Sequence, residues 1–204
     1  MKIKKQSNLL TDESFFETCD IINDNAQYLS KTIDDFRNFA EGKRDKSVFN
    51  LKKALDSFLV LIEGSLKYSE VNVEVDIDST IEINGYKNEL LQCLMNIFNN
   101  AKDAMEEQNK KDRFIFILII KNEEDLVINI KDNAGGIPKD ILPKIFEPYF
   151  TTKHKYQGTG LGLHMTYNLI VNGMNGSIEA KNISYKYNKK EYTGAEFIIT
   201  LPLT

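Results

Sequence analysis

The stretch CLMNIFNNAKDAM, residues 93–105, decides how the middle of this chain folds. Its apolar residues recur at the spacing of an amphipathic helix. Yet Asn96, Asn99 and Asn100 are weak helix formers, because their amides compete for nearby backbone groups. Asn96 and Asn100 are four residues apart and share one face, at the edge of the side expected to be buried. That buried side carries Leu90, Leu94, Ile97 and Ala101. Asn on this face is compatible with an ordinary polar helix surface and with a polar ligand.

Three further motifs fall at the expected ends of strands and helices. DNAGGIP, residues 132–138, ends a strand with Asp132 and adds two glycines that let backbone approach a flat ligand. IFEPYFTTK, residues 145–153, places aromatic residues before a polar segment. QGTGLGL, residues 157–163, is a glycine turn that leads into a helix. Such a turn presents backbone N–H groups and a positive helix end to an anion.

Taken singly, each motif has an ordinary explanation as a tight turn, a strand end or a polar helix surface. One ligand, ATP with a magnesium ion, explains all four together. Asp132 would accept a hydrogen bond from the adenine amino group, the following glycines would make room for the ring, and the Gly158–Gly162 turn would hold phosphates. Magnesium prefers hard oxygen ligands, so the amide oxygens of Asn96 and Asn100 would suit it.

The rest of the chain alternates between helical and strand patterns. The sequence predicts helices at 51–68 (capped by Asn50), 87–108 and 161–172, and strands at 71–77, 81–85, 114–121, 126–132, 176–182 and 194–202. The strand at 114–121 is nearly all apolar and is expected to be central in its sheet. This order predicts an α/β fold with a mixed sheet covered by helices on one face.

A separate helical pattern precedes this domain. Between Phe15 and Ala40 apolar residues recur at alternating gaps of four and three, a heptad seam carried for more than three repeats. Such a seam is typical of a helix that packs on another helix or on a second copy of itself, with an ordinary surface helix as the alternative. Residues 41–47 are charged and contain Gly, as a linker does. We therefore expect two parts, residues 1–46 and 47–204.

Composition and charge argue against several functions. The 204 residues carry a net charge of -4 with a pI near 5.4. No nucleic acid partner is expected, since phosphate backbones need clustered Lys and Arg; the basic runs at 2–5 and 186–190 are expected to be solvated ends and loops. No apolar run approaches the roughly 20 residues of a membrane span, so we expect a cytoplasmic chain, with membrane anchoring of a longer parent left open. Cys19 and Cys93 are expected to be buried thiols.

The four motifs in this order resemble the N box, the two glycine boxes and the F box of bacterial sensor histidine kinases, which belong to the GHKL ATP-binding superfamily. The resemblance covers about residues 48–204. It implies a Bergerat-type two-layer α/β sandwich, preceded by the long heptad-patterned helix, with ATP between the N-box helix and a mobile lid. Residues 47–204 would be the ATP-binding catalytic domain. Residues 1–46 would be part of a dimerisation and phosphoacceptor region without its acceptor His.

The match to these boxes also implies roles for single residues. Asn100 would be the direct magnesium ligand, with Asn96 beside it, and Gly136 would pack under the adenine ring. Asn96 and Lys153 are the expected catalytic residues, Lys153 lying in the lid within reach of the terminal phosphates. The full set expected to bind the cofactors ATP and Mg²⁺ is Asn96, Asn100, Asp103, Asp132, Gly136, Ile137, Phe150, Thr151, Thr152, Lys153, Gly158, Thr159, Gly160, Leu161, Gly162 and Leu163.

The chain departs from the family pattern at two places. Ala134 stands where the first glycine box usually has Gly, which is expected to crowd the site slightly. Asp103 and Ala104 replace the Lys and Tyr that many of these kinases carry. The absence of that Lys puts more weight on the basic residues at 153–155 for charge neutralisation.

The residue at position 96 separates two chemistries. Superfamily members that hydrolyse ATP carry a Glu at this position, whereas an amide cannot act as a general base. The resemblance therefore favours phosphoryl transfer to a protein His over hydrolysis, a reaction that depends on positioning and charge stabilisation. A GHKL-type ATPase, a nucleotide-sensing pseudokinase and a purely structural dimerisation module are the alternatives.

The acceptor His is not evident in this sequence. The only histidines are His154, in the lid motif, and His164, just after the glycine turn, and neither has the sequence context of an acceptor box. We expect a kinase core that cannot autophosphorylate by itself, as a piece of a larger kinase or, alternatively, of a split one. Its expected partners are the missing acceptor helix, a response-regulator receiver domain and, through the helix at 15–40, a second copy of the chain.

Overall fold

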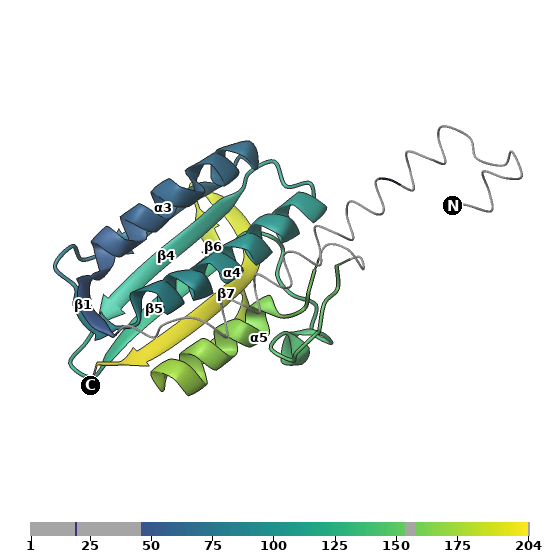
Figure 1. The fold of residues 1–204 in the computed structure, drawn as a ribbon. Coiled ribbons are helices and arrows are strands. Elements are labelled where there is room, and N and C mark those ends of the chain that lie inside the picture. The colour runs from purple at the N-terminus through teal and green to yellow at the C-terminus, as the bar shows by residue number, and fades with distance from the viewer. Residues whose placement is uncertain (1–18, 20–45, 154–157, 204) are drawn as a thin grey trace, which may run out of the picture.

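The computed structural model describes residue 19, residues 46–153 and residues 158–203 (Figure 1). The elements in chain order are β1 (Ser47–Asn50), α3 (Leu51–Tyr68), β2 (Asn72–Ile77), β3 (Glu82–Gly85), α4 (Lys87–Glu107), β4 (Phe114–Lys121), β5 (Asp125–Asp132), the 3-10 turn η1 (Leu142–Lys144), α5 (Gly162–Tyr167), the π-helical η2 (Asn168–Gly173), β6 (Ser177–Tyr187) and β7 (Lys190–Pro202). Apart from Cys19, the heptad pattern lies outside the described residues, so it stays a prediction.

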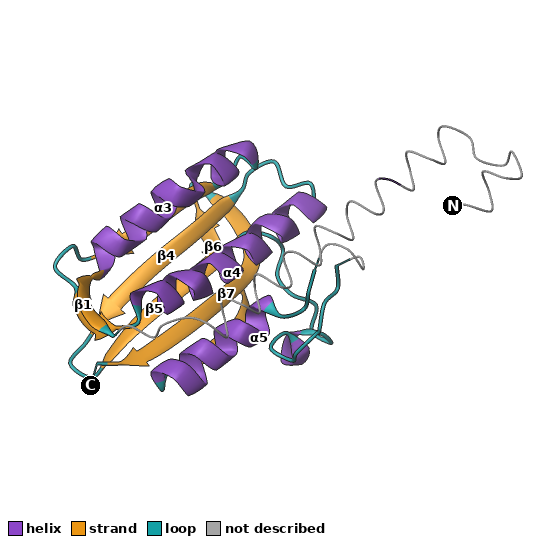
Figure 2. Ribbon diagram, viewed as in Figure 1, coloured by secondary structure: helices purple, strands orange, loops and turns teal. Residues whose placement is uncertain are grey.

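The main sheet has five strands in the order β2-β4-β5-β7-β6. β2 and β4 are parallel, and the other neighbours are antiparallel. β1, which the sequence did not reveal, pairs with β3 in a separate two-stranded sheet. The helices α3, α4 and α5 lie together on one face of the main sheet (Figure 2). The predicted two-layer α/β sandwich with a mixed sheet is confirmed.

The core lies between the helices and the sheet. β5 alternates along its length, and its inward residues Leu126, Ile128 and Ile130 are buried. The buried side of α4 includes the four residues predicted for it: Leu90, Leu94, Ile97 and Ala101. Each such Leu or Ile contributes roughly 1.5–3 kcal/mol by burial. With this side of α4 buried, its Asn-bearing face is left at the edge of the helical layer.

The structure confirms the interior position of the apolar strand at 114–121 and corrects the loop expected at 186–190. β4 lies inside the sheet, as its apolar sequence indicates, but Leu118 and Ile120 on its outer face are 39% and 50% exposed. Lys186–Lys190 is not a loop: it forms the tip of the β6–β7 hairpin, where Asn188 and Lys189 have positive φ. A two-residue turn of this kind matches the twist of its strands and so lets both continue to the tip.

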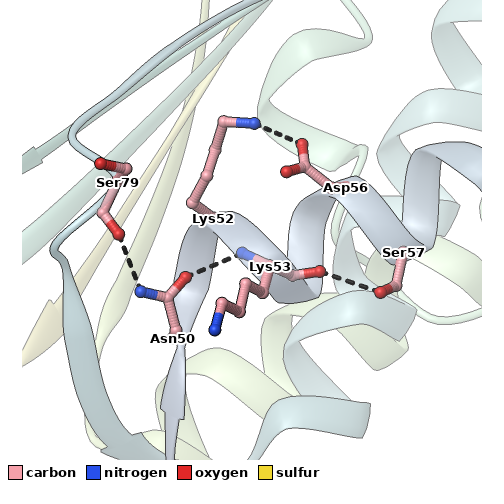
Figure 3. Close-up of polar contacts among 6 residues, drawn as sticks. All are labelled: Asn50, Lys52, Lys53, Asp56, Ser57 and Ser79. Carbon is pink, nitrogen blue, oxygen red and sulfur yellow. Dashed lines mark hydrogen bonds and ion pairs between the residues drawn. The ribbon is translucent and has the colours of Figure 1, made fainter.

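Helix α3 begins where the sequence places its cap. The Asn50 side chain accepts a hydrogen bond from the backbone N–H of Lys53 at 2.9 Å, and its amide nitrogen donates to the backbone oxygen of Ser79 at 2.8 Å (Figure 3). The first bond satisfies one of the free N–H groups of the first turn, and the second ties the helix start to the segment before β3.

The helix also contains a glycine that the fold does not require. Gly64 lies exposed inside α3, and a methyl group added there would meet nothing within 4 Å. We expect Gly64→Ala to raise the free energy of unfolding by about 0.5–1 kcal/mol, because Gly loses more backbone entropy than Ala in a helix. Urea unfolding of the two proteins measures the difference. A lower stability of the variant would contradict the helix described here.

The remaining predictions concern the last helix, the thiols and the membrane. The helix expected at 161–172 is present, but its second half is π-helical. Cys93 is buried, which raises its pKa to about 12 and keeps the thiol protonated, whereas Cys19 is only half-buried. Within the described residues, no helix is both long enough and apolar enough to cross a membrane.

Candidate nucleotide site

An open cleft of about 1210 Å³ lies along the polar face of α4, and residues from all four motifs line it. It is larger than a typical pocket for a drug-sized ligand, so it has room for a nucleotide. Every residue of the predicted cofactor set lines it except Leu161. The cleft is also lined by residues that the sequence did not single out for this site, among them Gln108 at the end of α4 and Ala195 and Phe197 of β7.

Asp132 is the buried carboxylate of this cleft, with only 5% of its surface exposed. Its Oδ1 accepts hydrogen bonds from the backbone N–H groups of Ala134 at 2.8 Å and Ala195 at 3.1 Å. No described residue donates to Oδ2, and no fully buried side-chain oxygen in the described part of the chain lacks a partner. Oδ2 therefore opens onto the cleft, where it can accept a hydrogen bond from a ligand. Burial raises the pKa of Asp132, although the two backbone hydrogen bonds oppose this effect.

The β6–β7 hairpin builds the wall behind Asp132. The Tyr185 hydroxyl donates to the backbone oxygen of Asp132 at 3.0 Å, and the N–H of Gly135 donates to the oxygen of Thr193 at 2.9 Å. A methyl group on Gly194 would overlap the backbone oxygen of Asp132, so the two strands meet at this point without room for a side chain. This wall could not be predicted from the sequence, because it depends on the pairing of strands that are distant in the chain.

The loop after Asp132 takes a shape that needs its glycines. Gly135 and Gly136 have φ of 89° and 86°, in the region that side chains disfavour. Asn182 on β6 fixes the loop: its Oδ1 accepts from the N–H of Ile137 at 2.7 Å and its Nδ2 donates to the Ile137 oxygen at 2.6 Å. Ala134 is not among the residues with positive φ, so its methyl group strains no backbone.

Asn96 connects α4 to the helix that follows the glycine turn. Its Nδ2 donates to the backbone oxygen of Gly162 at 3.0 Å and to the hydroxyl of Thr166 at 3.1 Å. These bonds hold the first turn of α5 against α4. The amide of Asn96 thus positions the glycine turn at this end of the cleft, a role that its predicted place in the metal site did not include.

The glycine turn itself lies against the F-box segment. Gly160 has φ of 65°, and a methyl group there would run into the backbone of Tyr149. A methyl group on Gly158 would come within 2.6 Å of the Thr151 hydroxyl. The turn and the segment at 149–153 therefore pack directly on each other, which brings Thr151, Thr152 and Lys153 to the end of the cleft that the glycine turn forms.

Lys153 lies among oxygen atoms of α4. Its Nζ forms an ion pair with Oδ2 of Asp103 at 2.6 Å and a longer hydrogen bond to Oδ1 of Asn100 at 3.4 Å. An ammonium group with a carboxylate and an amide oxygen marks a place suited to a cation. The described residues include no group of three or more His, Cys, Asp or Glu able to hold a metal by themselves. Magnesium often binds through one or two protein oxygens plus nucleotide phosphates, so this donor set fits it.

His164 has a defined structural task. Its Nε2 faces the Nδ2 of Asn168 at 2.9 Å, and an amide NH₂ can only donate, so this nitrogen is the acceptor. Its Nδ1 then carries the proton and donates to the backbone oxygen of Phe146 at 2.9 Å. His164 ties α5 to the start of the F box. The other histidine, His154, lies outside the described residues.

Fold and cleft together define the class of this protein. A mixed sheet under a helical layer, with a buried carboxylate at one end of the cleft and a glycine turn leading into a helix at the other, is the Bergerat type of α/β sandwich. The chain belongs to the family of histidine kinase-, DNA gyrase B-, and HSP90-like ATPases, whose model matches residues 85–204. Membership of this ATPase family implies that the chain binds ATP.

The sequences and structures of individual relatives are consistent with membership of this family. Sporulation kinase A of Bacillus subtilis is 35% identical over 128 residues, 62% of this chain and 20% of the relative. The chain therefore spans about a fifth of that kinase's length. The nucleotide-free catalytic domain of histidine kinase ThkA has a TM-score of 0.65 at 25% identity and covers 78% of this chain and 97% of that domain. ThkA in complex with the response regulator protein TrrA has a TM-score of 0.68 at 19% identity, covering 99% of this chain and 55% of ThkA, which shows a shared fold.

Proposed function

We propose that residues 47–204 are the catalytic domain of a sensor histidine kinase, which binds ATP with Mg²⁺ and transfers the γ-phosphoryl group to a His on a dimerisation helix. The observation that carries this proposal is the buried Asp132, whose Oδ2 faces the cleft while its Oδ1 is fixed by two backbone N–H groups. A fixed acceptor atom of this kind suits the amino group of adenine, which can only donate.

The other end of the cleft would hold the phosphates. The turn at Gly158–Gly162 leads into α5 and offers backbone N–H groups. Lys153, Thr151 and Thr152 lie beside it on the F-box segment. Asn100 would hold the magnesium ion with phosphate oxygens. When bound, the ion supplies charge stabilisation and orients the terminal phosphoryl group for in-line transfer.

Transfer is favoured over hydrolysis by the residue that stands at position 96. Hydrolysis needs a base that orients and deprotonates a water molecule, and an amide cannot supply one. The Nδ2 of Asn96 is also engaged with Gly162 and Thr166. Asn96 therefore contributes to catalysis by holding the glycine turn in place.

The acceptor and the partners follow from the same proposal. The acceptor would be a His on a dimerisation helix, and the region at 1–46 would belong to that part of the protein, with the seam at 15–40 as a dimer contact. Phosphoryl transfer would then pass to a response-regulator receiver domain; the ThkA complex with TrrA supports this by likeness of fold. We place the domain in the cytoplasm, where ATP is available.

Two measurements test this function. Calorimetric titration with a non-hydrolysable ATP analogue, with and without Mg²⁺, is expected to show micromolar to submillimolar binding that Mg²⁺ strengthens. With [γ-³²P]ATP, label is expected on a separately supplied dimerisation-helix fragment that carries an acceptor His, and not on the chain alone. Steady phosphate release by the chain alone would identify an ATPase instead. Binding with neither release nor labelling would identify a nucleotide-sensing pseudokinase.

The magnesium role of Asn100 has its own signature. We expect Asn100→Ala to weaken binding of the ATP analogue about tenfold in Mg²⁺, by loss of one ligand oxygen, and to change it little in EDTA. The same titrations measure both values. An equal loss in EDTA would show that Asn100 acts on the nucleotide or on the fold rather than on the metal. Asn99→Ala, on the neighbouring position of α4, is the matched control.

A further inference from the structure

The structure places one cation between two oxygen atoms that a metal ion would also favour. Asn100 and Asp103 are three residues apart and so project from one face of α4. Both their side-chain oxygens contact the same ammonium group, at 3.4 Å and 2.6 Å. The Lys153 and Asp103 side chains are 22% and 34% exposed, so water screens this pair less than it would a pair on the open surface.

We propose that Asn100 and Asp103 form a single cation site, which the Lys153 ammonium fills before nucleotide binds and Mg²⁺ fills afterwards. Asp103 is then part of the metal site, and Lys153 moves from Asp103 to the phosphates. This inference rests on the function proposed above and adds a carboxylate to the metal site. No covalent bond changes in the exchange: one cation replaces another beside the same two oxygens.

The chemistry of the donor atoms supports the exchange. Carboxylate and amide oxygens are hard ligands, and magnesium sites in phosphotransfer enzymes commonly combine one or two carboxylates with phosphate oxygens. Lysine is a compact charge on a flexible stem with several rotatable bonds, so its head group can move without moving the backbone. Lys153 also lies in the segment that packs on the glycine turn, which keeps it close to the phosphates after it leaves Asp103.

Charge explains why the exchange would need the metal. When Lys153 turns to the phosphates, the Asp103 carboxylate is left without its cation beside a strongly negative triphosphate. The carboxylate and the triphosphate, lying side by side in the cleft, repel each other unless a cation lies between them. In the absence of Mg²⁺, the triphosphate and Asp103 therefore compete for Lys153, and ATP binds weakly. With Mg²⁺ present, each negative group has its own cation.

The test compares nucleotide affinity with and without metal. The measured quantity is the magnesium factor, defined as Kd for the ATP analogue in EDTA divided by Kd in excess Mg²⁺. For Asp103→Asn we expect this factor to fall at least tenfold, because binding in EDTA becomes tighter and binding in Mg²⁺ becomes weaker. For Lys153→Met we expect the factor to rise about tenfold, since a free carboxylate then faces the phosphates and only Mg²⁺ can offset it.

A matched control separates this role from a structural one. Lys52 and Asp56 form an ion pair at 2.5 Å on α3, outside the residues that line the cleft (Figure 3). Asp56→Asn removes the same charge and is expected to leave the magnesium factor unchanged. If the Lys153–Asp103 pair only stabilised the cleft, both variants would weaken binding by the same ratio in EDTA and in Mg²⁺. The factor would then stay constant.

The outcomes distinguish this inference from the proposed function. The cation site alone is overturned if the wild-type chain binds the analogue and if Asp103→Asn and Lys153→Met keep the wild-type magnesium factor. A wild-type chain that binds no nucleotide overturns both proposals. A magnesium factor that falls in Asp103→Asn and rises in Lys153→Met supports the exchange. Thermal unfolding of each variant shows that the compared proteins are folded.

Discussion

Asp132→Asn is expected to lower the affinity for ATP about 100-fold while the protein stays folded. The Asn Oδ1 can still accept from the N–H groups of Ala134 and Ala195, so the local backbone keeps both bonds. In place of Oδ2, however, an NH₂ group would face the adenine amino group, and two donors cannot bond. A lost charge-assisted hydrogen bond with an unpaired group left behind costs about 3 kcal/mol, or two powers of ten in Kd. Titration calorimetry measures the loss.

The control for this variant lies on the same strand. Asp125 begins β5, Asp132 ends it, and only Asp132 lines the cleft. Asp125→Asn makes the same chemical change and is expected to leave ATP affinity unaltered. Unchanged affinity in Asp132→Asn would remove Asp132 from the adenine site, and with it the main support for the proposed function.

The free energy of unfolding of the same variant tests whether the pKa of Asp132 is raised in the native state. Burial raises its pKa above the ordinary 3.8, so the native state disfavours the charged carboxylate. The stability that Asp132 contributes is therefore fully present below its unfolded pKa and is lost as pH rises through the raised native pKa. An Asn side chain resembles the protonated carboxyl group and stays neutral at every pH, so the variant loses no stability as pH rises through this range. Asp132→Asn is thus expected to be at least as stable as the wild type at pH 7, with the difference shrinking towards pH 3 in urea unfolding.

Gly194→Ala is expected to have the largest effect on stability. The new methyl group would overlap the backbone oxygen of Asp132, and the carbonyl carbon and Oδ1 of Asp132 lie beside it. Backbone cannot turn aside as a flexible side chain can, so β7 would have to move away from β5 at the site. We expect a loss of about 3 kcal/mol in the free energy of unfolding, the upper part of the range for overpacked positions. Urea unfolding measures it.

Gly64→Ala is the matched control for Gly194→Ala, because the same methyl group is added in open space on α3. The two variants are expected to move stability in opposite directions. ATP affinity separates them further: Gly194→Ala shifts the carboxylate of Asp132 and should weaken binding, whereas Gly64→Ala should not. A stable Gly194→Ala protein with full affinity would mean that β5 and β7 do not approach each other as described.

The sequence predicted those features that depend on neighbouring residues. The Asn50 cap, the buried side of α4 and the glycines after Asp132 each follow from spacing or from a short motif. All but one of the residues that it predicted to bind the cofactors line the cleft, because each of the four motifs is continuous in the chain.

The features it missed depend on strand pairing and on charges far apart in the chain. Gly194 and Tyr185 contact Asp132 only because the β6–β7 hairpin runs past the end of β5. The Lys153–Asp103 pair joins residues 50 positions apart, and many other Lys and Asp residues could have paired as plausibly. Local pattern sets the type of each element, whereas register and side-chain partners are set by packing of the whole domain.

β7 lies inside the sheet, between β5 and β6, and this position also bears on the order in which the strands of the sheet can pair during synthesis. β7 leaves the ribosome after every other strand of the main sheet, yet it supplies the N–H of Ala195 that holds Asp132. Until it is in place, one edge of β5 has unpaired backbone groups, which are prone to pair with other chains. A nascent chain that ends before Lys190 therefore lacks the Ala195 N–H that holds Asp132, and this edge of β5 stays open until β7 has been made and has joined the sheet.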